Sequence, residues 1–278
     1  MPGTWLPITL IAANIVFSCA GFFNSDILDK YAFEIDPIRI HKDYKRLITS
    51  GFLHADWMHL FFNMLALYFF SGIAGIMGNG LFLGVYMASL LGGNLLLLYI
   101  YRNRGSYSAV GASGAVSGII FSSIALFPGM KINLFFIPIG IPSWLFGIIY
   151  MAYSVYQARF RSGDIAHEAH IGGAITGMVI TIMAFPGALT YNFWPILGIF
   201  IPVMIFLYIA VFKPHLFLID NRNFNKEKIY YNIEHVYNAN KASMQHEIDA
   251  ILEKIHHKGI ESLSKNEREI LDQYSQEP

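Results

Sequence analysis

Seven apolar stretches constrain this chain more than any other feature of its sequence. A helix that crosses about 30 Å of hydrocarbon needs roughly 20 residues, and each stretch approaches that length. The stretches lie at 4–23, 57–77, 80–101, 111–127, 137–158, 167–185 and 193–212. Because unpaired backbone groups are costly in lipid, helices are the structure that we expect there. The sequence therefore predicts an all-α fold, a polytopic membrane helix bundle.

Charge divides the chain into a membrane part and a tail. With 55% hydrophobic and 14% charged residues, the whole chain is more apolar than a soluble protein of its length. Residues 213–278 nevertheless hold 9 Lys/Arg and 11 Asp/Glu, about as many as the rest of the chain. We expect a membrane domain at 1–212, a polar linker at 213–242 and a small soluble helical hairpin at 243–275. Apolar residues at helical spacing and a capping box favour the hairpin.

The first connection, at about 24–56, is too long and too apolar for a plain linker, and we expect it to pack on the bilayer surface. The single cysteine, Cys19, excludes a disulfide within the chain.

Ser113 lies between Gly111 and Gly114 at the start of the fourth stretch. Free backbone N–H groups and the positive end of the dipole at a helix start suit an oxyanion on a bound carbonyl. Small neighbours would let a substrate backbone approach. The pattern predicts a candidate nucleophile, although Gly114 and Gly118, four residues apart, also occur where helices merely pack closely.

The sixth stretch begins with a candidate base, His170, with His167 one turn earlier. A neutral imidazole can accept the proton of a serine, and a Ser-His pair suffices for acyl transfer when other groups hold the geometry. An inert histidine at the membrane interface is the alternative. Gly173 and Gly177 give this helix a small face that allows close approach to the serine helix.

His59 and Asn63 share a face at the start of the second stretch, and His54 precedes them. Their side chains could donate to an oxyanion, or Asn63 could simply join helices. A metal or haem site at His54, His59, His167 and His170 is a further alternative. The absence of a His-Glu-x-x-His motif disfavours it, and we predict no metal and no cofactor.

Four blocks of residues, in this order and spacing, resemble the rhomboid intramembrane serine proteases over about 40–190. The blocks are Arg46-Leu47, then His54, His59 and Asn63, then Gly111-Ala112-Ser113-Gly114, and finally Ala169-His170 with Gly173. The family core has six helices, so the stretch at 193–212 would be an extra seventh transmembrane helix. The hairpin at 243–275 is similar to a small module at the C-terminus of some bacterial rhomboid-like proteins.

The resemblance assigns roles to these residues. It implies that Ser113 is the nucleophile and His170 the general base and then acid. His59, Asn63 and the Ser113 backbone would form the oxyanion hole. Arg46 would anchor the first loop in the bilayer surface, and Gly173 would let the sixth helix touch the fourth.

Two positions depart from the family pattern. Four residues after the serine, rhomboids usually carry an aromatic side chain that stacks on the base, whereas this chain has Ser117. Many members also have a glutamate in the second span where this chain reads Gly75-Ile76. Neither departure removes a candidate catalytic group.

We therefore expect an intramembrane serine endopeptidase that hydrolyses peptide bonds in or beside transmembrane segments of membrane proteins. Because a substrate helix must unwind to expose its carbonyl, helix-weak segments are the expected substrates. The bilayer is the other expected partner, nucleic acid is not expected, and the partner of the tail is unassigned. The alternative is a catalytically inactive rhomboid-like protein that binds transmembrane helices. The expected location is a bacterial inner membrane.

The basic residues predict an orientation. If all seven stretches span, 18 of the 19 Lys/Arg fall on the side that carries Ser113, His170 and the tail. The positive-inside rule then predicts a cytosolic C-terminus and a cytosolic catalytic mouth. The resemblance implies the opposite, since the mouth opens outward in familiar bacterial members.

Overall fold

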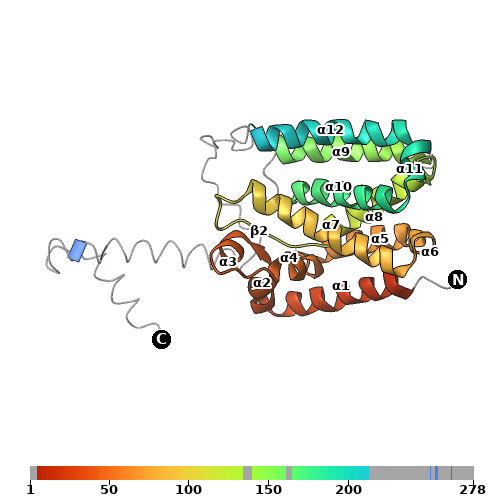
Figure 1. Cartoon of the computed structure of the whole chain (residues 1–278). Helices are drawn as coiled ribbons and strands as arrows, with labels where there is room; N and C mark the ends of the chain where they lie inside the picture. The colour runs from red at the N-terminus through yellow and green to blue at the C-terminus, as the bar shows by residue number, and fades with distance from the viewer. Residues whose placement is uncertain are drawn as a thin grey trace. The chain divides into compact units, whose positions relative to one another are not determined.

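The computed structural model describes residues 5–133, 140–160 and 165–212, and four positions further on, 251, 254, 255 and 264. The chain divides into two units, Met1–Ile219 and Asp220–Pro278. Nearly all the described residues belong to the first unit, which is an assembly of helices (Figure 1). The predicted linker and hairpin lie outside the described residues, apart from the four isolated positions.

Each of the seven apolar stretches contains a helix. These helices are α1 (Trp5–Phe23), α5 (Trp57–Phe70), α7 (Asn79–Ile100), α8 (Ser113–Leu126), α9 (Ser143–Phe160), α10 (His167–Ala184) and α12 (Phe193–Phe212). By length and composition, Trp5–Phe23, Trp57–Met77 and Asn79–Ile100 could cross a membrane, whereas α8 and Phe193–Ile209 are apolar but shorter. The prediction of an all-α membrane bundle is confirmed; the number of spans stays a prediction.

Short elements connect the long helices. They are α2 (Ser25–Tyr31), β1 (Phe33–Glu34), α3 (Ile35–Arg39), α4 (Arg46–Thr49), η1 (Ser50–Phe52), η2 (Ser71–Ile73), α6 (Ala74–Met77), β2 (Ser108–Ala109), β3 (Lys131–Ile132), β4 (Ile141–Pro142) and α11 (Gly187–Tyr191). The strands form two antiparallel pairs, β1 with β2 and β3 with β4.

Two of these stretches show detail that the apolar pattern does not give. In the second, α5 ends at Phe70 and is followed directly by η2 and α6, and the Ser71 hydroxyl donates to the Tyr68 carbonyl. In the fifth stretch, among the residues described from 140 onward, β4 occupies Ile141–Pro142 and α9 begins at Ser143. A β-branched residue followed by proline favours a short edge strand over a helix interior.

α8 lies at the centre of the bundle. Every residue from Gly114 to Ala125 is buried. The helix packs most extensively on α10 and α7, and it also contacts α5 and α9. In Figure 1, α12 and α9 form one outer layer, α10 follows, then α7, α8 and α5, with α1 on the opposite side. The start of α8 is therefore held by neighbours on several sides.

The first connection folds into a small structure of its own. Phe33, Ile35 and Ile38 are fully buried, and they form a second core with Leu47 and Leu97. β1 pairs with β2, which precedes α8 in the chain. This segment is thus no plain linker, as predicted, and it is tied to the residues that lead into α8; its contact with the bilayer stays a prediction.

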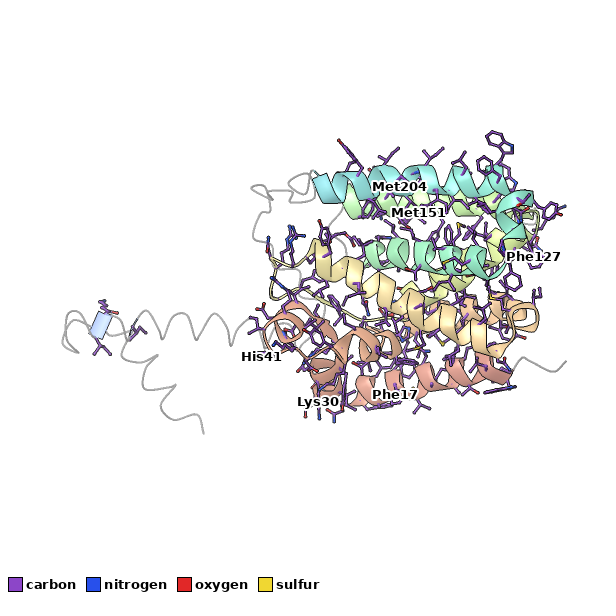
Figure 2. The ribbon with its side chains drawn as sticks, in the orientation of Figure 1. Phe17, Lys30, His41, Phe127, Met151 and Met204 are labelled. Carbon is purple, nitrogen blue, oxygen red and sulfur yellow. The ribbon has the colours of Figure 1, made fainter. Side chains whose placement is uncertain are left out.

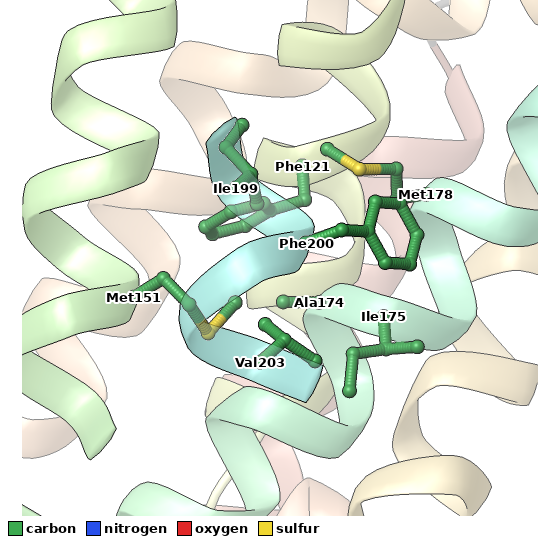
Figure 3. A pocket seen from close by; sticks show the side chains of 8 residues that line it. All are labelled: Phe121, Met151, Ala174, Ile175, Met178, Ile199, Phe200 and Val203. Atoms are coloured by element: carbon green, nitrogen blue, oxygen red, sulfur yellow. The ribbon is translucent and has the colours of Figure 1, made fainter. Parts of the chain in front are cut away.

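Apolar side chains lie both on the outer surface of the bundle and in its interior, as expected for helices that face lipid. Figure 2 labels Phe17 of α1 and Met204 of α12, which are 54% and 58% exposed, and Met151 of α9, which is 1% exposed. Met151 also lines a small pocket where α12 meets α8, α9 and α10 (Figure 3). All eight lining side chains are apolar, so this pocket offers no chemistry.

Candidate functional site

The turn before α8 places Ser113 at the first position of the helix. Gly111 has a φ of +136°, a conformation that glycine alone adopts without strain, and its N–H donates to the Ser50 carbonyl at 3.0 Å. Asn94 of α7 donates to the Ser50 hydroxyl and to the Leu47 carbonyl. The turn is therefore fixed from the first connection and from α7.

The start of α8 leaves backbone donors for a ligand. Ala112 is the N-cap residue, and no side chain caps the helix in the described part of the chain. The first N–H groups of a helix have no acceptor within the helix. The N–H groups of Ser113 and Gly114 therefore point towards the N-terminal side of α8 without an acceptor in that helix. Such donors at the positive end of a helix suit a developing oxyanion.

The helices that carry Ser113 and His170 meet backbone to backbone. A Cβ atom on Gly173 would overlap the Gly114 carbonyl, and one on Gly177 would lie 2.6 Å from the Gly118 Cα. A Cβ on Gly114 would in turn lie 3.3 Å from the carbonyl oxygen of Ala169. This is the contact at Gly173 that the resemblance implies, and it joins the residues next to Ser113 and His170.

His170 lies in the first turn of α10 and is half-buried. The His167 ring meets it edge-on, with centroids 5.4 Å apart and planes at 72°. The Tyr150 ring of α9 lies nearly parallel to it, with centroids 6.2 Å apart and planes at 23°. The imidazole is thus held between two rings, and sequence reasoning identified only the first of them.

His59 reaches the turn before Ser113. A Cβ on Gly111 would lie 2.9 Å from His59 Nε2 and 3.7 Å from Ser113 Oγ. The backbone of His59 is fixed because its N–H donates to Asp56, the N-cap of α5, at 2.8 Å. Asn63 is buried one turn further along, and its amide donates to the His59 carbonyl at 3.0 Å. The structure therefore brings His59 to Ser113 and keeps Asn63 behind it.

His54 supports the turn from the other side. The Ser18 hydroxyl of α1 donates to the Phe52 carbonyl at 3.0 Å, so its oxygen accepts from His54 Nδ1 at 2.8 Å. His54 Nε2 is then free to accept from the Ala112 N–H at 3.4 Å. Burial, with the nearby imidazole of His59, lowers the pKa of His54 to about 3 against the opposing charge of Asp56. A neutral His54 therefore links α1 to the residue before Ser113.

A tyrosine pair that sequence reasoning missed braces the start of α10. Tyr101 and Tyr107 stack with centroids 3.9 Å apart, and the Tyr101 hydroxyl donates to Glu168 at 2.7 Å. Burial and the Glu168 carboxyl raise the pKa of both phenols, so Tyr101 remains a donor. The spacing of these residues carries no signal, because the loop between α7 and α8 brings the rings together.

Arg46 lies inside the first connection. It is 8% exposed, and it donates to the Ala32 carbonyl at 2.9 Å and to Asp43 at 3.1 Å. Glu34 lies 3.6 Å from it. Arg46 thus holds this segment together from within.

The four histidines form two pairs, since the His54 and His59 rings also meet edge-on at 5.0 Å. In the ranges that the structure describes, no three His, Cys, Asp or Glu side chains gather in a set that could hold a metal ion. The arrangement is one of a serine at the start of α8, with His59 beside the preceding turn and His170 on the helix that packs against α8.

Comparison with known families decides what kind of protein carries this site. The family model for the rhomboid domain matches residues 41–187, more than half of the chain. The chain belongs to the rhomboid family. Its Ser113 turn, its paired helix starts and His59 all lie in the matched range. A second model, a family of unknown function named DUF6576, matches residues 231–277, which include the whole of the predicted hairpin at 243–275.

Several curated rhomboids are similar to this chain. Rhomboid protein 1, mitochondrial, of Saccharomyces cerevisiae is 32% identical over 50% of this chain and 43% of its own length. RHOMBOID-like protein 12, mitochondrial, of Arabidopsis thaliana is 31% identical over 61% of this chain and 55% of its own length. Rhomboid protease AarA of Providencia stuartii is 28% identical over 81% of this chain and 89% of its own length. The chain thus spans about half of the first two relatives and most of the third.

Proposed function

We propose that this rhomboid is an intramembrane serine protease in which Ser113 and His170 form the catalytic dyad. The observation that carries the proposal is the backbone contact of Gly173 with Gly114, because it joins the helix starts that hold the two residues. A dyad without a tightly bound third member depends on such fixed geometry. The protease names of relatives such as AarA support the proposal at the level of the family.

The reaction would proceed through an acyl-enzyme. Ser113 Oγ attacks the carbonyl carbon of the scissile bond while its proton passes to His170. The tetrahedral intermediate collapses as the carbon–nitrogen bond breaks, and His170 returns the proton to the leaving amine. A water molecule then gives a proton to His170 and attacks the ester, and the proton returns to Ser113 as the acid product leaves. No cofactor takes part in these steps.

The negative charge of each tetrahedral intermediate would be stabilised beside the start of α8. The Ser113 N–H supplies a backbone donor, and His59 supplies a side-chain donor from across Gly111. Asn63 would act at the same position from one turn along α5, after releasing the His59 carbonyl that it now binds. Loss of one such donor typically lowers the rate by about 10²–10³-fold.

Membrane proteins are the proposed substrates. The bundle exposes apolar side chains such as Phe61 and Phe62 of α5, so a substrate helix can reach it through lipid. Segments with weak helix propensity are favoured because the scissile carbonyl must leave its helical hydrogen bond. We place the chain in a bacterial inner membrane, because AarA shares the longest stretch with it among the three relatives above.

Cleavage of a model transmembrane substrate by purified protein in proteoliposomes tests the proposal. Ser113→Ala and His170→Ala should each abolish cleavage, because the two residues act as one unit. Ser123→Ala is the matched control. It removes a hydroxyl from the same helix that donates to the Ile119 carbonyl at 3.1 Å, and it should keep the wild-type rate. Cleavage that survives in Ser113→Ala would overturn the assignment of the nucleophile, and a wild type that does not cleave would favour the non-catalytic binder.

A further inference from the structure

Tyr150 of α9 occupies a place beside the candidate base that the sequence leaves unfilled on α8. Its ring lies nearly parallel to the His170 imidazole, with planes at 23° and centroids 6.2 Å apart. Ser117, one turn after Ser113, carries only a hydroxyl where rhomboids usually carry an aromatic ring. The ring beside His170 therefore comes from a different helix.

Three contacts fix the Tyr150 ring. Its hydroxyl shares a hydrogen bond of 2.9 Å with the hydroxyl of Ser117. Phe121 of α8 and Phe146 of α9 lie beside it, with ring centroids 5.7 Å and 5.8 Å away. The short side chain at position 117 thus does two things. It leaves space for a ring from α9, and it binds the end of that ring.

A general base works only when one ring nitrogen faces the hydroxyl that it deprotonates. An imidazole on a flexible side chain can turn away, and each turned conformer is inactive. An aromatic ring stacked on one face, with His167 edge-on nearby, limits that rotation. This restriction acts on the rate of the chemical step and leaves substrate binding almost unchanged.

We propose that Tyr150 is a positioning residue for His170 and that Ser117 holds Tyr150 in place. The inference rests on the proposed function, since it concerns the base of the same dyad. It adds α9 to the catalytic unit: the nucleophile comes from α8, the base from α10, and the orientation of the base from α9. Movement of α9 away from α10 would remove the ring and lower the rate even though Ser113 and His170 remain.

Steady-state cleavage of the transmembrane substrate tests this with four variants. In Tyr150→Leu, which removes the ring, kcat should fall by about 10- to 100-fold while KM changes by less than about twofold. Tyr150→Phe, which keeps the ring, should restore most of that loss. Ser117→Ala should resemble Tyr150→Phe, because both lose only the hydrogen bond.

Trp144→Leu is the matched control, because it removes a partly exposed aromatic side chain from the first turn of the same helix. It should keep the wild-type kcat. Thermal unfolding of each variant checks folding. Each variant is then assayed at the same interval below its own unfolding midpoint. Under these conditions Tyr150→Phe must still restore the rate that Tyr150→Leu loses.

The outcomes separate the two proposals. If Ser113→Ala is inactive but Tyr150→Leu cleaves at the wild-type kcat, the positioning role is wrong and the protease assignment stands. A loss in Tyr150→Leu that appears only in KM, or that Tyr150→Phe fails to restore, also overturns the positioning role. If the wild type does not cleave, the protease assignment is wrong and this inference falls with it.

Discussion

Adding one methyl group at Gly173 should separate the two helices of the dyad. The Cβ of Gly173→Ala would lie 2.6 Å from the Gly114 carbonyl carbon and 3.0 Å from its Cα, and these are backbone atoms that cannot rotate aside. Ordinary contact begins near 3.4 Å, so α8 and α10 must move apart by at least about 0.8 Å, and the Gly114 carbonyl oxygen, which lies nearer still, requires more. Overpacking of this kind costs about 1–3 kcal/mol. The higher helix propensity of alanine offsets about 0.5–1 kcal/mol of this loss in unfolding free energy.

The shift should affect catalysis more than stability. A misplacement of about 1 Å between reacting groups costs roughly 10²-fold in rate. We expect Gly173→Ala to lose about 1–2 kcal/mol of unfolding free energy and about 10²-fold in kcat. Chemical unfolding in detergent and substrate cleavage measure the two quantities.

Gly84→Ala provides the control, because a Cβ at this position of α7 meets no atom within 4 Å. It should be slightly stabilised, by about 0.5–1 kcal/mol, with an unchanged rate. If Gly173→Ala matched Gly84→Ala in both stability and rate, the close contact between α8 and α10 would not control the dyad.

Three further predictions concern the surroundings of the site. His59→Ala and Asn63→Ala should slow cleavage without abolishing it, since the Ser113 N–H still donates, and wild-type turnover in both would assign them to packing. The pKa of folded His54, about 3, lies below its ordinary 6.5, so the unfolded chain binds the extra proton between these values. The unfolding free energy should therefore fall as the pH falls from 6.5 towards 3. Thermal unfolding at about pH 7.5 and about pH 5 should show a smaller loss of stability in His54→Gln than in the wild type. An equal loss in the two proteins would exclude His54 as the source. Truncation from about Asn240 should leave a membrane-inserted protein that cleaves substrate, whereas loss of either would make the tail part of the core.

The main features of the bundle could be predicted because they depend on local sequence. Long apolar stretches form helices, and glycines with a serine at the start of a stretch predicted the position where α8 begins. The apolar pattern did not give the change from α5 to η2 at Ser71 or the strand at Ile141–Pro142, which depend on short-range bonding by Ser71 and on the pairing of β3 with β4. Hydropathy alone cannot separate an apolar strand from the end of an apolar helix.

The dyad residues could also be proposed from sequence, but their surroundings could not. Ser117 was identified as a departure from the family pattern, yet nothing in the sequence of α9 distinguishes Tyr150 from the other aromatic residues of that helix. Its role depends on the packing of α9 beside α8 and α10. The same holds for Ser18, which reaches His54 from α1 only through the tertiary fold.

The central claim is that Ser113 is a nucleophile activated by His170. Labelling of the purified full chain with a fluorophosphonate, followed by mass spectrometry of its peptides, tests this directly. We predict one phosphonate adduct on Ser113, lost in Ser113→Ala, strongly reduced in His170→Ala and retained in Ser123→Ala. An unlabelled wild type, an adduct on another serine, or equal labelling in His170→Ala would contradict the account.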